Sequence, residues 1–489
     1  MFQTVEQLIE NPVFYFFKEI SNIPRGSGNE KKISDYLTGF ARERSLEVVQ
    51  DKAFNVMIKK PATKGYENAP TVILQGHMDM VCELNKGTVH DFEKDPIELR
   101  IESDMLYANG TTLGADNGIA VAYMLALLDA DHIAHPALEV VITTEEETTM
   151  GGAIAVDPTH FTGEIFINLD SEEEGKLLVS SAGGICGKLS LPINWETAPE
   201  YTGSYRLSIG GLRGGHSGME IDKERGNANK LLSRILYDLS NEIAYHLSEI
   251  NGGLKPNAIP REAEAILVIE LEAAEKLTMK IDEWNRMLKN ELQASDQEVY
   301  VKLEKAAFAE KVFSKETTER VVQAIMLTPT GIQSMSMDIK GLVESSTNLG
   351  VITTSDSEVC FQNEIRSSVR SLKEQILNQV NVIAQTLGGK VETSGNYPEW
   401  AYNSNSAIRE LFKKVYERKY GKKAEIIAIH AGIECGVFTE KIPGLDAISF
   451  GPDMFDVHTP NEHLSIPSTI RTWEYLLAVL EEMNTIKGI

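Results

Sequence analysis

Short apolar runs and one long apolar stretch mark the first part of the chain. Residues 72–74 are Val, Ile and Leu, and residues 138–143 and 164–169 are also rich in apolar, β-branched side chains. Continuous apolar runs of this length are typical of strands that are buried on both faces of a parallel sheet. Residues 119–128 are apolar nearly all round, which predicts a buried helix. This part of the chain is therefore predicted to form an α/β layer.

The pattern changes near residue 186 and changes back near residue 395. Between these points strands and helices alternate twice, with one set from 205 to 303 and a second set from 315 to 393. The tail again shows a helix followed by apolar strands. We therefore predict a discontinuous α/β domain formed by residues 1–185 and 395–489. Residues 186–394 are expected to form an inserted α+β domain with two similar halves.

Composition excludes several classes of protein. The 489 residues are 42% hydrophobic and 24% charged, which is typical of a globular protein of two or more domains. The net charge of −25 disfavours binding to nucleic acid or to anionic membranes. The longest apolar run, 118–128, is far shorter than the roughly 18 residues that a transmembrane helix needs. We expect neither nucleic acid nor membrane as a partner.

The cysteines and the N-terminus both indicate the cytoplasm. Residues 1–11 contain two glutamates and lack the basic and apolar regions of a signal peptide. The four cysteines are scattered and form no CxxC pair. So few cysteines in so long a chain are typical of free thiols in a reducing compartment. We therefore expect a cytoplasmic protein.

Imidazole and carboxylate groups follow the predicted strands, where ligands bind in parallel sheets. The set consists of His77, Asp79, Asp116, Glu146, Glu147, Asp170 and His458. Such mixed nitrogen and oxygen donors suit Zn²⁺ and, less tightly, Co²⁺ or Mn²⁺. Even five of these seven groups exceed the needs of one ion, so two ions that share a carboxylate fit better. A carboxylate beside the ligands is then available as a general base.

Each member of this set also has a plain structural explanation. His77 alone could be a buried loop histidine, Asp116 a helix cap, and His458 a turn residue. The run 145–147 could be a solvated start of a helix. The glycine-rich segment 210–215 lacks both the GxGxxG spacing and the GK[ST] end of phosphate-binding loops. Its glycines more simply allow a tight turn next to His216.

The ordered motifs resemble the M20 family of di-zinc peptidases. The elements shared with the whole family are His77-x-Asp79, LGADNG at 113–118, the Glu146-Glu147 pair, NLD at 168–170, GGHSG at 214–218 and HTP at 458–460. Further motifs resemble its aminoacyl-histidine dipeptidase branch. These are TVHDFEKDP at 88–96, GTTLGADNG at 110–118, NLDSEEEG at 168–175, GNANK at 226–230, NAIPREA at 257–263 and HAGIECG at 430–436. They span nearly the whole chain.

The resemblance implies a discontinuous catalytic domain that binds two Zn²⁺ ions, with Co²⁺ or Mn²⁺ as substitutes. It assigns His77 and Asp170 to one ion, Glu147 and His458 to the other, and Asp116 to both. Met78 stands where the family often has Leu, which is a mild exchange of similar volume. Because Glu145 precedes this pair, Glu145 and Glu146 could serve as base and ligand instead. The distance to Met150 favours Glu146 and Glu147.

The resemblance also implies the catalytic and substrate-binding groups. Asp79 orients His77, and Glu146 takes a proton from the metal-bridging water and passes it to the leaving amine. The inserted domain is implied to be a lid, from which His216 stabilises the oxyanion. Substrate binding is assigned to His216, Asn257, Arg366 and Gly432. Arg366 is expected to pair with the terminal carboxylate of a dipeptide.

The expected activity is hydrolysis of short, unblocked dipeptides, including Xaa-His dipeptides. Another M20 activity remains an alternative, either as a tripeptidase or as an N-acyl amino acid deacylase. An inert binding homologue is less consistent with the sequence, because every expected ligand and the general base are present. In M20 enzymes with a half-sized lid, a dimer partner completes the site. A doubled lid could supply His216 to its own site, and a homodimer through another surface stays open.

Overall fold

The chain folds into two compact units. The computed structural model describes Phe2 and residues 4–486. Unit 1 contains the described residues up to Ser180, Trp400–Ala428 and the residues from Ile433 onward, and unit 2 contains Ser181–Glu399 and Ile429–Gly432. The last segment was expected in the first domain. It belongs to unit 2 because the Ala182 N–H donates to the carbonyl groups of Ile429 and Ala431.

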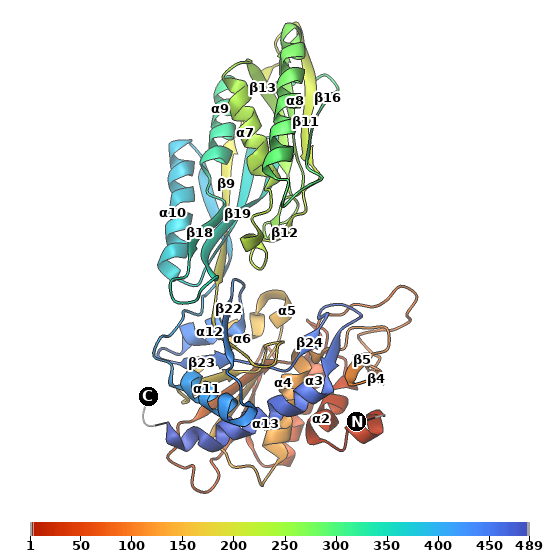
Figure 1. The fold of residues 1–489 in the computed structure, drawn as a ribbon, viewed down its shortest axis with the longest axis vertical. Coiled ribbons are helices and arrows are strands. Elements are labelled where there is room, and N and C mark those ends of the chain that lie inside the picture. Colours follow the sequence, from red (N-terminus) through yellow and green to blue (C-terminus); the bar gives the residue numbers. More distant parts are fainter. Residues whose placement is uncertain (1, 3, 487–489) are drawn as a thin grey trace. The chain divides into compact units, whose positions relative to one another are not determined.

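Unit 1 contains a mixed sheet with helices on its two faces (Figure 1). Its helices are α1 (Val5–Leu8), α2 (Pro12–Ser21), α3 (Lys31–Glu43), α4 (Ala115–Asp129), α5 (Glu146–Thr149), α6 (Gly151–Ala155), α11 (Ala407–Tyr420), α12 (Glu434–Lys441) and α13 (Ile466–Glu482). Its strands are β1 (Glu47–Gln50), β2 (Val56–Lys60), β3 (Val72–His77), β4 (Leu99–Glu102), β5 (Met105–Ala108), β6 (Leu138–Thr143), β7 (Ile165–Asn168), β8 (Lys176–Ser181), β22 (Glu425–Ile429), β23 (Asp446–Ser449), β24 (Met454–Phe455) and β25 (His463–Ser465).

The central strands of unit 1 are parallel, as the apolar runs predict. The eight-stranded sheet has the order β1-β2-β6-β3-β7-β23-β8-β22. Strand β3 pairs in parallel with β6 on one side and with β7 on the other. Every residue of these three strands is buried. Their carboxyl ends therefore meet at one edge of the sheet, where the polar residues of the site follow.

Helices bury both faces of this sheet. Helix α4 is buried along nearly its whole length, which confirms the prediction from its apolar surface, and it packs against α2 and β3. On the opposite face, Phe438 of α12 lies against Phe166 of β7, with ring centroids 4.9 Å apart. Strands buried on both sides in this way have little freedom to shift. They therefore form a rigid support for the groups at their ends.

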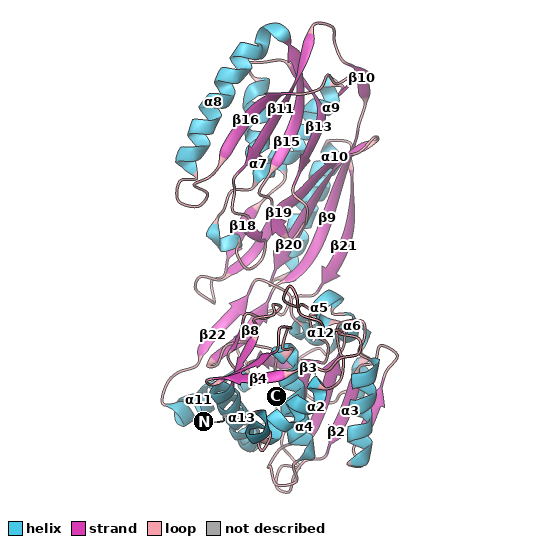
Figure 2. Cartoon of the chain, turned by 90° about the vertical axis from the view of Figure 1, so that its right-hand side faces the viewer, coloured by secondary structure: helices cyan, strands magenta, loops and turns pink. Residues whose placement is uncertain are grey.

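Unit 2 contains one nine-stranded sheet and, outside it, four further strands that form two separate two-stranded sheets. Its strands are β9 (Gly183–Pro192), β10 (Trp195–Thr197), β11 (Thr202–Gly210), β12 (Gly215–His216), β13 (Tyr245–Gly252), β14 (Ala258–Ile259), β15 (Ala263–Glu270), β16 (Tyr300–Lys305), β17 (Lys311–Phe313), β18 (Gly331–Met335), β19 (Val343–Thr354), β20 (Glu358–Ser367) and β21 (Lys390–Tyr397). Its helices are α7 (Ala228–Ser240), α8 (Ala274–Glu291), α9 (Lys315–Leu327) and α10 (Arg370–Thr386). In Figure 2 the strands face the viewer, with α7, α9 and α10 behind them.

The two halves of unit 2 have the same order of elements. One half runs β11-α7-β13-β15-α8-β16 along the chain, and the other runs β9-α9-β19-β20-α10-β21. Their strands lie in the orders β13-β15-β11-β16 and β19-β20-β9-β21. The halves join where β13 pairs with β19 in antiparallel orientation. The first half is therefore inserted after the first strand of the second half, whereas the sequence pattern suggested two consecutive halves.

The sequence pattern does not predict several strands of unit 2, among them the long strands β9 and β13. Strand β9 contains three glycines among its first five residues, and β13 alternates polar and apolar side chains only weakly. Both are held by their neighbours rather than by local propensity, since β9 pairs along its whole length with β20. Across the described part of the chain, no helix is both long enough and apolar enough to cross a membrane.

Candidate metal centre and substrate-binding residues

The strand ends of unit 1 bring the predicted metal ligands together. His77 is the last residue of β3, and Asp170 lies two residues beyond β7. Asp116 lies in the first turn of α4, at a point where the backbone has left helical geometry. The His77 Nε2 atom is 3.3 Å from Asp116 Oδ1 and 3.6 Å from Asp170 Oδ1. These three side chains form the first potential ligand group.

A second group shares Asp116 with the first. The Nε2 atom of His458 lies 3.1 Å from Asp116 Oδ2 and 3.0 Å from Glu147 Oε2. In each group the ligand atoms lie within 4.8 Å of one another. The two oxygens of Asp116 thus face different groups, as a carboxylate that bridges two ions must. The Oε1 atom of Glu147 is buried and has no hydrogen-bond partner among the described residues, so this donor set can accept a cation.

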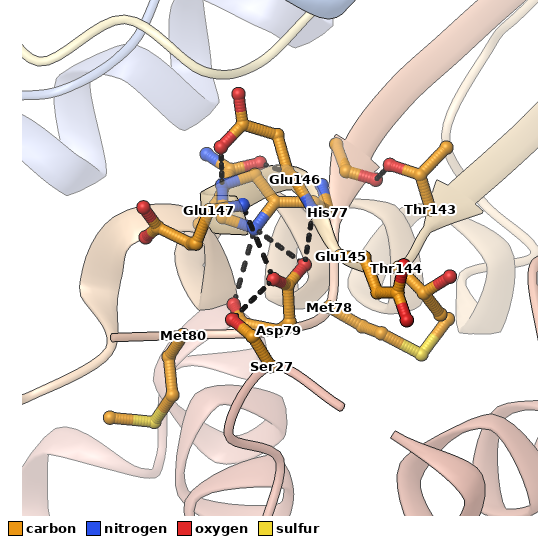
Figure 3. A network of polar contacts seen from close by, with 12 residues as sticks. Ser27, His77, Met78, Asp79, Met80, Thr143, Thr144, Glu145, Glu146 and Glu147 are labelled. Atoms are coloured by element: carbon orange, nitrogen blue, oxygen red, sulfur yellow. Dashed lines mark hydrogen bonds and ion pairs between the residues drawn. The ribbon is translucent and has the colours of Figure 1, made fainter. Parts of the chain in front are cut away.

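Asp79 braces the site from below, as Figure 3 shows. It is fully buried, and its Oδ1 lies 3.3 Å from His77 Nδ1. It also accepts hydrogen bonds from the Ser27 hydroxyl and from the backbone N–H groups of Glu146 and Glu147. A proton held on Nδ1 leaves the Nε2 lone pair of His77 free for a metal. One carboxylate therefore orients both His77 and the loop that follows β6.

The three consecutive glutamates have different surroundings. The carboxylate of Glu147 lies beside His458, and that of Glu146 is 3.9 Å from His77. The exposed Glu145 instead accepts a weak hydrogen bond from Thr149 at 3.5 Å. Figure 3 labels all three side chains. This geometry favours Glu147 as the ligand and Glu146 as the carboxylate beside the ligands.

The electrostatics of the group favour bound cations. Burial raises the pKa of Glu146 to about 8, and burial also raises the pKa of Asp170 well above its usual value. Hydrogen bonds to Asp116 and Glu147 raise the pKa of His458 to about 11. Burial opposes the ionisation of Asp116, but hydrogen bonds from His458 and His77 lower its pKa overall. The carboxylates thus compete for protons, and divalent cations would stabilise their charged forms instead.

Two buried residues that the sequence analysis missed hold the loops of this site. Glu462 accepts backbone hydrogen bonds from Leu113, Gly114, Ala115 and Asp116, at 2.7 to 3.3 Å. The backbone of Gly114 has a φ of +67°, which suits glycine and turns these N–H groups toward one carboxylate. Glu462 therefore sets the position of the backbone at Asp116, the residue that both potential ligand groups share.

Arg25 joins the same loop to the end of β3. Its Nη2 donates to the carbonyl of Gly114 and its Nη1 donates to that of Met78. The side chain is almost completely buried, and an added Cβ at Gly118 would lie 2.5 Å from its Nη2. Burial lowers the pKa of Arg25, while the charges of Glu462 and Asp79 oppose that shift. The buried guanidinium thus connects the loop before Asp116 to the end of β3, where His77 lies.

Glu434 is a third residue without a predicted role. It lies in the HAGIECG motif at 430–436, and its carboxylate is fully buried. It accepts hydrogen bonds from Gln75 and Thr143, and Gln75 in turn accepts one from Asn168. Burial raises its pKa to about 7. This network connects the ends of β3, β6 and β7 immediately beneath the ligands, which helps to keep their register.

The four predicted substrate-binding residues all lie in unit 2. Backbone N–H groups of Gly218 and Met219 donate to the Nδ1 atom of His216, at 3.2 and 3.0 Å. Burial and the charge of Arg366 lower the pKa of His216. The ring is therefore neutral and carries its proton on Nε2, where it can act as a hydrogen-bond donor.

His216 has close neighbours among the other predicted residues. It pairs with Ala258, next to the exposed Asn257, and both His216 and Asn257 line a cavity of about 870 Å³. An added Cβ at Gly218 would lie 3.1 Å from the His216 ring and 3.3 Å from Arg366 Cδ. His216, Asn257 and Arg366 thus belong to one region of unit 2, and Gly432 lies nearby on the segment Ile429–Gly432.

Two ligand groups that share one carboxylate at the strand ends of an α/β sheet are typical of two-metal hydrolases. Residues 73–482 match the model of peptidase family M20/M25/M40. The chain belongs to this family, as its motifs predicted.

Relatives over the full length give more detail. The chain is 37% identical over 479 residues to the cytosol non-specific dipeptidase of Escherichia coli (strain K12), covering 98% of this chain and 99% of that relative. It is 38% identical to the aminoacylhistidine dipeptidase from Vibrio alginolyticus, whose crystal structure superimposes with a TM-score of 0.93 and matches 99% of this chain and 98% of that chain. The chain shares only its fold with the aminopeptidase PepT from Bacillus cereus ATCC 10987. The identity is 16% and the TM-score is 0.56, and the match covers 97% of this chain and 98% of that chain.

We expect Glu462→Gln to weaken metal binding about 10- to 100-fold, because an amide oxygen is a poorer acceptor for the N–H groups that position Asp116. Titration of metal-stripped protein with Zn²⁺ against a competing chelator measures this affinity. The exposed Glu47 of β1 offers the matched control Glu47→Gln, which should bind as the wild type does. Equal affinity in both variants would contradict the role of Glu462.

Proposed function

We propose that this protein is a cytoplasmic, metal-dependent dipeptidase that cleaves unblocked dipeptides, including those with a C-terminal histidine. The observation that supports it most directly is the shared carboxylate of Asp116 between two ligand groups, with Glu146 beside them. The names of the two relatives above 35% identity agree with this activity, and the name of one of them places it in the cytosol.

The proposed centre holds two Zn²⁺ ions, for which Co²⁺ or Mn²⁺ can substitute. One ion is assigned to His77 and Asp170, the other to Glu147 and His458, and Asp116 is assigned to both. Two divalent ions held by these residues would supply the chemistry of such centres, a lowered pKa of bound water and polarisation of a carbonyl oxygen. The donor set of two imidazoles and three carboxylates is suited to these metals.

The residues around the centre supply the proton transfers and the binding. Glu146 takes a proton from the attacking water and delivers it to the nitrogen of the leaving amine. Asp79 keeps His77 in the tautomer that leaves Nε2 free. His216, in the neutral state that its surroundings favour, donates a hydrogen bond from Nε2–H to the oxyanion of the tetrahedral intermediate. Arg366 binds the terminal carboxylate, while Asn257 and Gly432 complete the binding of the peptide.

A substrate panel tests the proposal. Metal-stripped protein and protein restored with Zn²⁺, Co²⁺ or Mn²⁺ are assayed with β-Ala-His, Gly-His, Ala-Ala, Leu-Gly-Gly and N-acetyl-Ala. We expect metal-dependent cleavage of the dipeptides only. Cleavage of the tripeptide or the acetyl compound instead would assign another M20 activity. No turnover with any metal, despite bound ions, would leave an inert binding homologue as the best explanation.

Glu146→Gln should lower kcat by about three orders of magnitude, because the amide cannot accept the proton. Metal content, measured by elemental analysis, should stay unchanged. The adjacent Glu145→Gln is the matched control and should retain its activity, since Glu145 is exposed and faces Thr149. If only Glu145→Gln lost activity, Glu145 would be the general base and Glu146 the metal ligand.

His216→Ala should lower kcat about 100-fold, because the Nε2–H donor to the oxyanion is lost. Circular dichroism and metal content should match the wild type. His246, another histidine of unit 2, has its Nδ1 atom 3.0 Å from the carbonyl oxygen of Phe313, and His246→Ala serves as the control. A His216→Ala variant as fast as this control would show that unit 2 takes no part in the chemical step.

A further inference from the structure

A row of side chains crosses four strands at the position of Arg366. In the register of the sheet, Arg366 of β20 lies opposite Ser346 of β19 and Gly184 of β9. Gly184 lies in turn opposite Tyr397 of β21. Residues at paired positions project from the same face of a sheet. The glycine therefore leaves the space between Arg366 and Tyr397 open across the intervening strand.

The ring of Tyr397 fills that space closely. An added Cβ at Gly184 would lie 2.4 Å from the Tyr397 hydroxyl oxygen and 2.4 Å from its Cζ. An added Cβ at Gly432 would lie 2.5 Å from Cε2 of the same ring. Neither glycine has a φ that demands glycine, since both lie outside the left-handed region. The two residues thus serve to admit the ring, and their backbones hold it in place.

The hydroxyl of Tyr397 ends at the guanidinium of Arg366. The Nη1 atom of Arg366 donates to this hydroxyl at 2.6 Å. The nearest carboxylate, Glu364, is 3.4 Å from Nη2. The Nε atom is buried and has no hydrogen-bond partner within the described residues, so Arg366 retains donor capacity although it is 5% exposed. A buried guanidinium that is only partly satisfied is suited to an anionic ligand.

We propose that Tyr397 is a positioning residue, which fixes the Arg366 guanidinium so that its remaining donors meet the terminal carboxylate of the dipeptide. The inference deepens the proposed function and rests on the role given there to Arg366. The Tyr397 hydroxyl itself acts through Arg366. The space that Gly184 and Gly432 leave beside them explains the fixed position of the Tyr397 ring. Gly432 thereby contributes to substrate binding through its small size.

Tyr397→Phe tests this inference, because it keeps the ring in this space and removes only the hydroxyl. We expect KM for Ala-Ala and Gly-His to rise about tenfold with kcat changed less than twofold, since a hydrogen bond to a charged group is lost. The matching dipeptide amides lack the carboxylate, so their kcat/KM should not change. The preference of the enzyme for free dipeptides over amides should fall about tenfold.

A second tyrosine provides the control. The Tyr245 hydroxyl, also in unit 2, donates to the carbonyl of Leu236, away from Arg366. Tyr245→Phe should keep the wild-type preference for free dipeptides. If Tyr397→Phe kept it as well, or lost activity equally on free and amidated substrates, this inference would be wrong while the proposed function stood. A wild type that cleaves no dipeptide would overturn the proposed function as well.

Discussion

The crowding of carboxylates at the strand ends of unit 1 is the constraint on which the rest of the structure depends. Asp116, Glu146, Glu147 and Asp170 converge on two imidazoles, and like charges at such distances oppose one another. Two features keep these side chains in position. They follow strands that are buried on both faces, and backbone hydrogen bonds to the buried carboxylates of Asp79 and Glu462 fix the loops. Divalent cations bound between the groups would offset this repulsion.

The two units use sheets in different ways. In unit 1 parallel pairing collects residues from distant segments at one edge, so the site is built from the ends of strands. In unit 2 antiparallel pairing sets residues side by side across the strands, and the row from Ser346 to Tyr397 is the result. In the proposed function, metal binding and proton transfer belong to the strand ends of unit 1, and the recognition of the terminal carboxylate belongs to the face of the sheet in unit 2.

The proposed metal site was accessible from the sequence because its parts are local. His77 and Asp79, the glutamates 145–147 and Asp170 each follow an apolar run, and the rule for parallel sheets brings such positions together. The bracing residues carry no comparable signal. In the sequence, Arg25 resembles a surface residue of a loop. Glu462 accepts a hydrogen bond from the N–H of Leu113, which lies 349 residues away in the chain. Tyr397 ends a polar strand and belongs to no motif used in the sequence analysis.

The sequence by itself determined the family, the class of the fold and the identity of the candidate ligands, because apolar periodicity and short motifs are properties of neighbouring residues. The resemblance already assigned Asp116 to both ions and favoured Glu146 and Glu147. Only the tertiary structure gave the contacts of Asp116 with both groups, the contact between Glu147 and His458, and the tautomer of His216. It also decided that β9 opens the second half of unit 2, since that half is completed only after an inserted segment. These features depend on contacts between residues far apart in the chain, and those contacts form only when the sheets pair.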